Sequence, residues 1–191
     1  MLIAHYDQID LDWEEVAERG LIDERRGLVI AQVAVLDDLI DEFILYLLDP
    51  PDPAQYQRDH LDTITTGLRL GSFEQLLRDN QLLDNKASRT IADLRAIVAT
   101  RNRLAHGTIY RRPTRVAPIR ELATSTVDVE WVLVDRRRGD TERVSMAGLR
   151  RTLHEAQGCF MALLAFAETF VEAAPTPTHF PGGWYLGSPT A

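Results

Sequence analysis

Three of the five residues at positions 49–53 are prolines, and this run constrains the fold more than any other stretch of the chain. Proline lacks the backbone N–H that a helix needs and its ring clashes with the preceding turn, so no regular helix continues through Asp49-Pro50-Pro51-Asp52-Pro53. Before the run, apolar residues recur every three or four positions, which predicts an amphipathic helix from about 23 to 48. Its expected buried stripe is Val29, Val33, Leu36, Leu39, Ile40, Phe43, Ile44 and Leu47.

Helical spacing also predicts shorter helices on either side of that boundary. We expect one at about 12–18, ended by Gly20, and one at 54–70, ended by Gly71. The second would bury the side chains of Tyr56, His60, Leu61, Ile64 and Leu68. Ser72, with Gln75 three residues later, matches a capping box and predicts a short helix to about 83. Asp84 or Asn85 would then cap a helix that runs from about 86 to 106.

After residue 107 the period changes from helical to alternating. Residues 127–134 alternate in the manner of a strand, 136–140 resemble a turn, and 141–145 return as a shorter strand. A third, irregular strand around 116–122 is possible, and Pro113 and Pro118 would keep it away from the centre of a sheet. Ser145 would cap the last helix, whose expected stripe is Leu149, Leu153, Ala156, Phe160, Leu163, Ala167 and Phe170.

These elements predict a mainly α fold: an up-and-down bundle of four to five helices, with a small β-hairpin inserted before the last helix. We expect a single domain over residues 1–173, with the hairpin insertion at about 114–145. The tail, 174–191, is rich in Pro, Gly and Thr and is expected to be loosely held. Its aromatic residues Phe180, Trp184 and Tyr185 could still dock on the domain or on a partner.

Charge is distributed unevenly along the chain. The 191 residues carry a formal net charge of −8, typical of a globular protein and no indication of nucleic-acid binding by itself. Residues 100–151, however, contain 12 arginines against 6 acidic residues. A basic segment in an acidic protein indicates a local surface that attracts anions, although a few solvated arginine-rich loops would give the same count.

Several features favour a cytoplasmic protein without a membrane span. Cys159 is the single cysteine, so no disulfide framework is expected. The first residues lack the charged-then-apolar layout of a signal peptide. Acidic residues interrupt the apolar run 28–48, which argues against a transmembrane helix. The histidines at 5, 60, 154 and 179 have no ligands at metal-site spacing, so we expect neither a metal nor a cofactor.

The most specific stretch is Arg101-Asn102-Arg103-Leu104-Ala105-His106-Gly107, at the end of the predicted 86–106 helix. Ile91, Leu94, Val98 and Ala105 form the apolar stripe of that helix. By helical geometry Arg101 borders one side of the stripe, and Asn102 and His106 border the other. Polar groups beside a buried seam are unfavourable unless they are paired, so they indicate a site or a specific network. Gly107 predicts a left-handed helix end.

This stretch resembles the signature of the HEPN superfamily, in which four to six residues separate an arginine, often followed directly by an asparagine, from a histidine. The similarity includes the order of helices and covers roughly residues 20–173. It implies an all-α bundle that forms a homodimer, with two motif helices around one shared cleft. Many members are metal-independent endoribonucleases of toxin or anti-phage defence systems, which implies an RNA substrate and a possible cognate antitoxin or other defence-system protein as a partner.

The resemblance implies roles for individual side chains. His106 would be the general acid or base at the ribose 2′-OH or the leaving 5′-oxygen, because imidazole ordinarily exchanges protons near neutral pH. Arg101 would stabilise the charge of the pentacoordinate phosphate, and Asn102 would orient His106 or bind a phosphate oxygen. Arg103, Arg111 and Arg112 are candidates for binding RNA phosphates. Family members often have a further polar residue on an earlier helix, for which Asp37, Asp38 and Asp41 are candidates, although each is also compatible with a solvated acidic face.

Two other interpretations remain open. Arg101, Asn102 and His106 could instead form a buried network that ties helix ends together in a non-catalytic α-helical dimerisation or binding module. Trp131 and the arginines at 136–138 could touch RNA, but a packed core residue and an ordinary solvated turn explain them better.

Overall fold

The computed structural model describes residues 13–113, 129–135, 139–181 and 185–186. Its helices are α1 (Trp13–Leu48), α2 (Pro53–Tyr56), the π-helix η1 (Gln57–Leu61), α3 (Thr66–Asp79), α4 (Asn85–His106) and α5 (Met146–Ala173). Its strands are β1 (Thr108–Pro113), β2 (Val129–Asp135) and β3 (Asp140–Val144). The predicted fold class is confirmed: a helical bundle with a small antiparallel sheet before the last helix.

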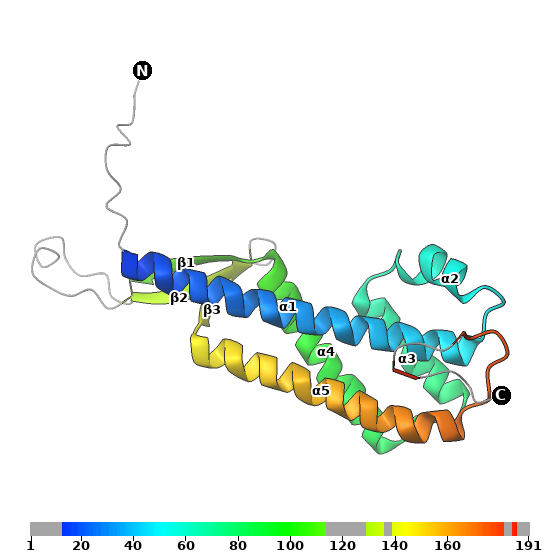
Figure 1. Ribbon diagram of the computed structural model, residues 1–191. Helices are drawn as coiled ribbons and strands as arrows, with labels where there is room; N and C mark the ends of the chain where they lie inside the picture. The colour runs from blue at the N-terminus through cyan, green and yellow to red at the C-terminus, as the bar shows by residue number, and fades with distance from the viewer. Residues whose placement is uncertain (1–12, 114–128, 136–138, 182–184, 187–191) are drawn as a thin grey trace, which may run out of the picture.

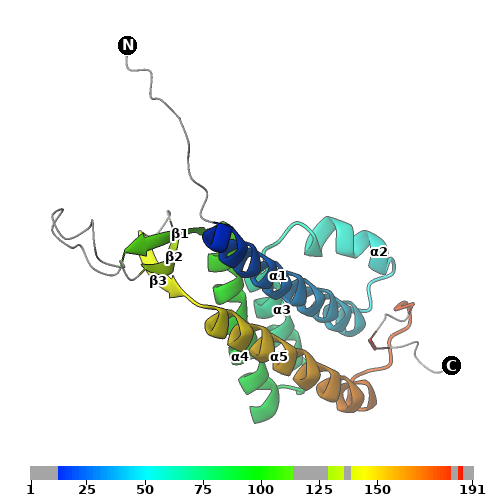
Figure 2. The same ribbon diagram turned by 60° about the vertical axis from the view of Figure 1, so that its left-hand side comes forward.

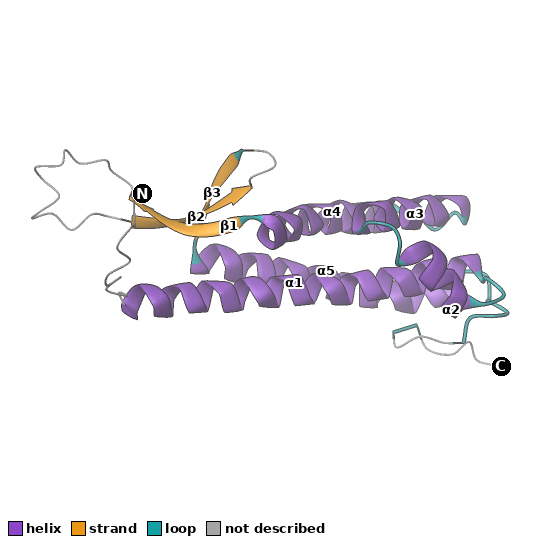
Figure 3. Ribbon diagram, turned by 90° about the horizontal axis from the view of Figure 1, so that it is seen from above, coloured by secondary structure: helices purple, strands orange, loops and turns teal. Residues whose placement is uncertain are grey.

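Four helices form the bundle, and the sheet lies at one end of it (Figure 1). Helices α1 and α5 pack along each other in one layer, and α3 and α4 form the other layer (Figure 3). The short helix α2 lies at the opposite end from the strands, as the rotated view also shows (Figure 2). The sheet therefore adjoins the start of α1, the end of α4 and the start of α5.

Helix α1 is continuous where a break was expected at Gly20. A Cβ at Gly20 would have nothing within 4 Å, so the position is open helix surface, and glycine weakens a helix there by only about 1 kcal/mol. The far end of α1 agrees with the sequence. Asp49 adopts a left-handed conformation with φ 44° immediately before the prolines, which ends the helix. All of the predicted stripe is buried except Leu47, which is half-buried.

The expected helix over 54–70 is wrong. Asp52 accepts a hydrogen bond from the Gln55 N–H and starts α2, which continues as η1 and stops at Leu61. Thr65 then caps α3 by accepting from the Leu68 N–H, so α3 runs through Gly71 and Ser72 is not a cap. The side chains of His60 and Leu68, predicted to point inward, are exposed.

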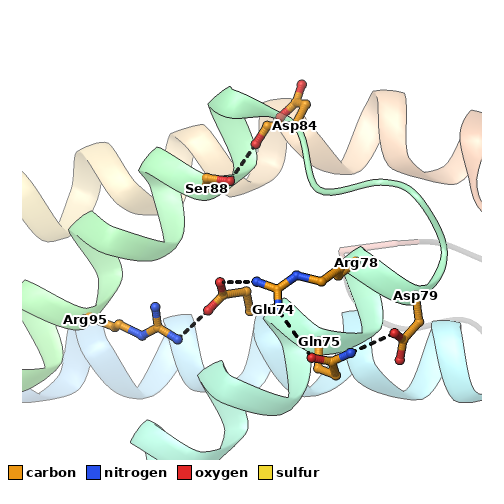
Figure 4. A network of polar contacts seen from close by, with 7 residues as sticks. All are labelled: Glu74, Gln75, Arg78, Asp79, Asp84, Ser88 and Arg95. Atoms are coloured by element: carbon orange, nitrogen blue, oxygen red, sulfur yellow. Dashed lines mark hydrogen bonds and ion pairs between the residues drawn. The ribbon is translucent and has the colours of Figure 1, made fainter.

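Helix α4 begins at the predicted cap, where an Asp84 carboxylate oxygen accepts from the Ala87 N–H at 2.7 Å. The Asp84 carbonyl oxygen also accepts from Ser88 Oγ at 2.8 Å (Figure 4). Its buried stripe contains Ile91, Leu94 and Val98 as expected, but near the end Leu104 is buried in place of Ala105. Gly107 ends the helix in an extended conformation with φ −80°, not the left-handed one predicted.

Close packing explains the glycine at position 107. A Cβ there would lie 2.6 Å from Leu133 Cδ1 and 2.8 Å from the Arg103 carbonyl oxygen, both shorter than van der Waals contact allows. Glycine is therefore needed for the close approach of α4 to β2 and not for its conformational freedom.

The three strands form an antiparallel sheet in the order β1-β2-β3. β2 pairs with β1 through Ile109↔Leu133 and with β3 through Trp131↔Val144. β1 directly follows α4, which the sequence interpretation missed. The predicted strand around 116–122 and the arginine turn at 136–138 lie outside the described residues.

Two apolar cores hold these elements together. The larger one joins the second half of α1 to α3, α4 and α5 and contains Phe43, Phe73 and Phe170, with the Phe43 and Phe170 rings edge to face at 4.7 Å. The smaller one joins the sheet to the helix ends and consists of Ile22, Val29, Leu104, Ile109, Trp131, Leu133, Val144 and Leu149. Trp131 is thus a core residue, and the smaller core fixes the end of α4 on which the 101–107 stretch lies.

The C-terminal tail is not loose where the structure describes it. Phe180 and Leu186 are buried in the larger core, and Tyr185 packs against Phe160. The Asp49 carboxylate accepts hydrogen bonds from the backbone N–H groups of residues 178–180. Helix α5 is long and apolar enough to cross a membrane by length and composition, but its predicted stripe packs against the other helices of the bundle.

Candidate functional site

Arg101, Asn102 and His106 line one open groove, with a volume of about 820 Å³, between α4, α3, the middle of α1 and the end of β2. The sequence interpretation placed Arg101 on the opposite side of the apolar stripe from the other two. Its long side chain instead turns toward Asn102, which brings all three polar groups to the same cavity. Arg69 and Arg103 also line the groove.

Arg101 is held by two contacts within the protein. Its Nη1 donates to Asn102 Oδ1 at 2.8 Å, and its Nη2 lies 3.7 Å from Asp37 Oδ2. The side chain keeps 24% of its surface exposed, so the guanidinium is oriented but still accessible from the groove. An anion in the groove would meet a pre-positioned arginine fork.

The partner of Arg101 belongs to a buried polar network on α1. Asp37 and Asp41, one helical turn apart, are 7% and 3% exposed. Asp37 Oδ2 accepts from Thr66 Oγ1 at 2.9 Å, and Asp41 Oδ2 pairs with Arg69 Nη1 at 3.1 Å. Arg69 also donates from Nε to the Leu61 carbonyl at 3.0 Å. The network thereby joins the α1 acids to α4 through Asp37 and to the start of α3 through Thr66 and Arg69.

Burial dominates the ionisation of both acids. Desolvation raises the pKa of Asp37, against the lowering effects of the Thr66 hydrogen bond and the Arg101 charge. Desolvation likewise raises the pKa of Asp41 to about 7, although the Arg69 guanidinium lowers it. The prediction of a solvated acidic face is therefore wrong for Asp37 and Asp41 and right for the exposed Asp38.

His106 is exposed at the end of α4, on the edge of the groove. Within the described part of the chain its imidazole has no hydrogen-bond or ion-pair partner, so the ring is accessible to a ligand. The backbone on both sides of it is fixed, because Arg26 Nη2 of α1 donates to the carbonyls of Ala105 and Gly107, each at 3.2 Å. These bonds satisfy carbonyls that the helix end leaves without partners.

The predicted RNA-binding arginines separate into two places. Arg103 lines the groove, donates to Thr100 Oγ1 at 3.2 Å and lies 3.5 Å from Glu142 of β3. Arg111 and Arg112 lie on β1, outside the groove lining, and Arg112 pairs with Glu130 of β2 at 2.7 Å. The structure brings Arg103 to the candidate site and does not bring Arg111 or Arg112 there.

Five polar residues of the groove lining were missed from the sequence: Thr65, Thr66, Arg69, Arg95 and Asp135. Arg95 follows the buried Leu94 on α4 and pairs with Glu74 of α3, which also pairs with Arg78 (Figure 4). The periodicity of α4 could have placed Arg95 beside the stripe. Thr66 and Arg69 could not be placed, because the start of α3 was assigned to the wrong residue.

Comparison of the chain with protein-family models, with curated proteins and with solved structures finds no match. Among the described residues, no group of three or more His, Cys, Asp and Glu side chains could hold a metal ion.

Proposed function

We propose that the protein is a metal-independent endoribonuclease of the HEPN type, which acts as a homodimer in a toxin or anti-phage defence role. His106 would transfer a proton to or from the ribose 2′-OH or the leaving 5′-oxygen. Arg101 would stabilise the charge that develops on the phosphate. Attack by the 2′-OH forms a 2′,3′-cyclic phosphate as the bond to the 5′-oxygen breaks, so DNA would not be cut.

The observation that carries this proposal is the accessibility of His106 beside an oriented Arg101 in one groove. A histidine that only filled a core gap would be buried and bonded, whereas this ring is exposed and lines the cavity. Asn102 and Asp37 hold the guanidinium that would face the phosphate. Such pre-orientation favours charge stabilisation in a transition state, because the donors need not reorganise.

The direct test is incubation of the purified protein with mixed single-stranded and structured RNAs, with and without EDTA. We expect the wild type to cut RNA in EDTA, to leave DNA of the same sequence intact and to produce cyclic phosphate ends. His106→Ala and Arg101→Ala should each lose at least about a hundredfold in rate, the usual size of a lost acid–base or charge-stabilising group.

Arg89→Ala is a matched control, because Arg89 is an exposed arginine on the same helix outside the groove lining. It should cut RNA at the wild-type rate. Absence of any RNA cleavage, or equal cleavage by the His106, Arg101 and Arg89 variants, would exclude the proposed enzyme.

A second function, a non-catalytic α-helical dimerisation or binding module, is favoured by one specific observation. Arg101 makes its contacts with Asn102 and Asp37, as a residue in a structural network would. This alternative expects the wild-type protein to form a dimer that does not cut RNA. It also expects Arg101→Ala to lose thermal stability. Thermal unfolding of the wild type and of Arg101→Ala, beside the cleavage assay, separates the two functions.

A further inference from the structure

A second cavity adjoins the candidate site on the other side of Arg103. It has a volume of about 280 Å³ and lies between the last turns of α4, strand β3 and the first turns of α5. Arg103, Arg143 and Arg151 line it together with one acid, Glu142. Arg103 lines both this cavity and the groove of Arg101 and His106, so the two are joined by one positively charged side chain.

The arginines of this cavity are weakly engaged within the protein. Arg103 and Glu142 lie 3.5 Å apart with side chains 42% and 54% exposed. Arg143, with 75% of its side chain exposed, lies 3.6 Å from Glu130. Arg151 has no ion pair with any residue that the structure describes. Exposed pairs of this kind contribute little free energy, so a strong anion could replace them.

We propose that this cavity binds a second phosphate of the same nucleic-acid strand whose cleavage was proposed above. Arg151 and Arg143 would contact that phosphate, and Arg103 would lie between it and the phosphate at Arg101. The strand would then run from the end of α4 across to β3 and the start of α5. The proposal rests on the proposed function for its substrate class, but its contacts are to the backbone and do not require cleavage.

A phosphate subsite has a measurable signature in salt. Each arginine that neutralises a phosphate releases condensed counterions. For a single strand, the slope of log Kd against log salt concentration is therefore about 0.7 per contact. Removal of one contact should therefore lower the slope by about that amount. It should also weaken binding about tenfold at low salt, the usual effect of one charged hydrogen bond.

The experiment measures binding of a fluorescein-labelled single-stranded DNA of about 12 nucleotides, by fluorescence anisotropy, at several salt concentrations. DNA lacks the 2′-OH, so it reports backbone contacts without being cut. Arg151→Gln and Arg143→Gln should each weaken binding and lower the salt slope. Glu142→Gln should tighten binding, because it removes the opposing charge.

Arg150→Gln is the matched control, since Arg150 is the exposed neighbour of Arg151 on α5 and does not line the cavity. It removes the same charge and should leave Kd and slope near their wild-type values. Equal effects of Arg150→Gln and Arg151→Gln, or no effect of either, would overturn the proposal.

The outcome is separable from that of the proposed function. If the protein cuts RNA but Arg151→Gln binds the DNA as the wild type does, the proposed enzyme stands and the second subsite is excluded. If Arg151→Gln weakens DNA binding but the protein does not cut RNA, the second subsite stands and the proposed enzyme is excluded.

Discussion

Replacing Gly107 by alanine tests whether the end of α4 is set by close packing. The residue has φ −80° and ψ 155°, a conformation that any residue adopts, so alanine would introduce no backbone strain of its own. The new Cβ would instead meet Leu133 Cδ1 at 2.6 Å, Leu133 Cγ at 2.8 Å and the Arg103 carbonyl oxygen at 2.8 Å. Any penalty therefore comes from steric overlap alone.

The size of that penalty depends on what can move. Leu133 is 4% exposed in the smaller core, so its side chain has little room to rotate away. The Arg103 carbonyl accepts the Gly107 N–H at 2.8 Å, so moving it disturbs the last turn of α4. Overpacking in such places destabilises proteins by roughly 1–3 kcal/mol. A loss of about 2 kcal/mol would lower the Tm of a chain of this size by roughly 4–8 °C.

Thermal and urea unfolding, followed by circular dichroism at 222 nm, would measure the change. Gly20→Ala is the matched control, because a Cβ at Gly20 would have nothing within 4 Å on the surface of continuous α1. That variant should be more stable than wild type by about 0.5–1 kcal/mol, the helix preference of alanine over glycine.

The two glycine variants should therefore shift stability in opposite directions. A Gly107→Ala protein as stable as wild type would show that α4 and β2 are not in the close contact described. A destabilised Gly20→Ala protein would show that α1 is interrupted at residue 20.

Two further predictions concern α3 and the buried acids. Thr65→Ala should lower the free energy of unfolding by about 1 kcal/mol through loss of the α3 cap, whereas Ser72→Ala, in the helix interior, should change it by less than about 0.5 kcal/mol; urea unfolding of both variants distinguishes the observed start of α3 from the predicted one. Burial raises the pKa of Asp41 in the folded state from 3.8 to about 7. The stability gained from its protonated carboxyl group is therefore fully present below about pH 4 and is lost as pH rises through 7. Asp41→Asn should therefore gain stability relative to wild type as pH rises from 4 to 7, by at most about 1.4 kcal/mol per pH unit, and the gain should level off above pH 7, while the exposed Asp38→Asn should show no such trend.

Sequence patterns predicted the elements that are governed by apolar periodicity. The stripes of α1 and α5 are long, so a single unusual residue does not obscure them, and the caps at Asp84 and Ser145 match their side-chain chemistry. Local sequence signals predicted the wrong helix ends where tertiary packing determines them. Gly20 and Gly71 were expected to break their helices, but neither does. Ile22, which follows Gly20, and Leu70 and Phe73, on either side of Gly71, are buried against neighbouring elements.

The candidate site was predicted only in part, because sequence spacing relates residues within one helix but not residues that tertiary packing brings together. Arg101, Asn102 and His106 are close in sequence, and one helix brings them to one cavity. Asp37, Thr66 and Arg69 come from two other helices, and no spacing within α4 indicates them. The choice of Asp37 over Asp38 depends on which side of α1 faces α4, which is decided by packing in three dimensions.

The contact of Asp49 with the tail has a consequence for the order of folding. It joins positions 129 to 131 residues apart in the chain, at the junction of α1 with the proline run. Contacts of such long sequence separation form slowly, because chain entropy must be lost before they contribute. The tail can find Asp49 only once α1 and α5 already lie side by side, so we expect this contact to be among the last made during folding and among the first to open in the native state.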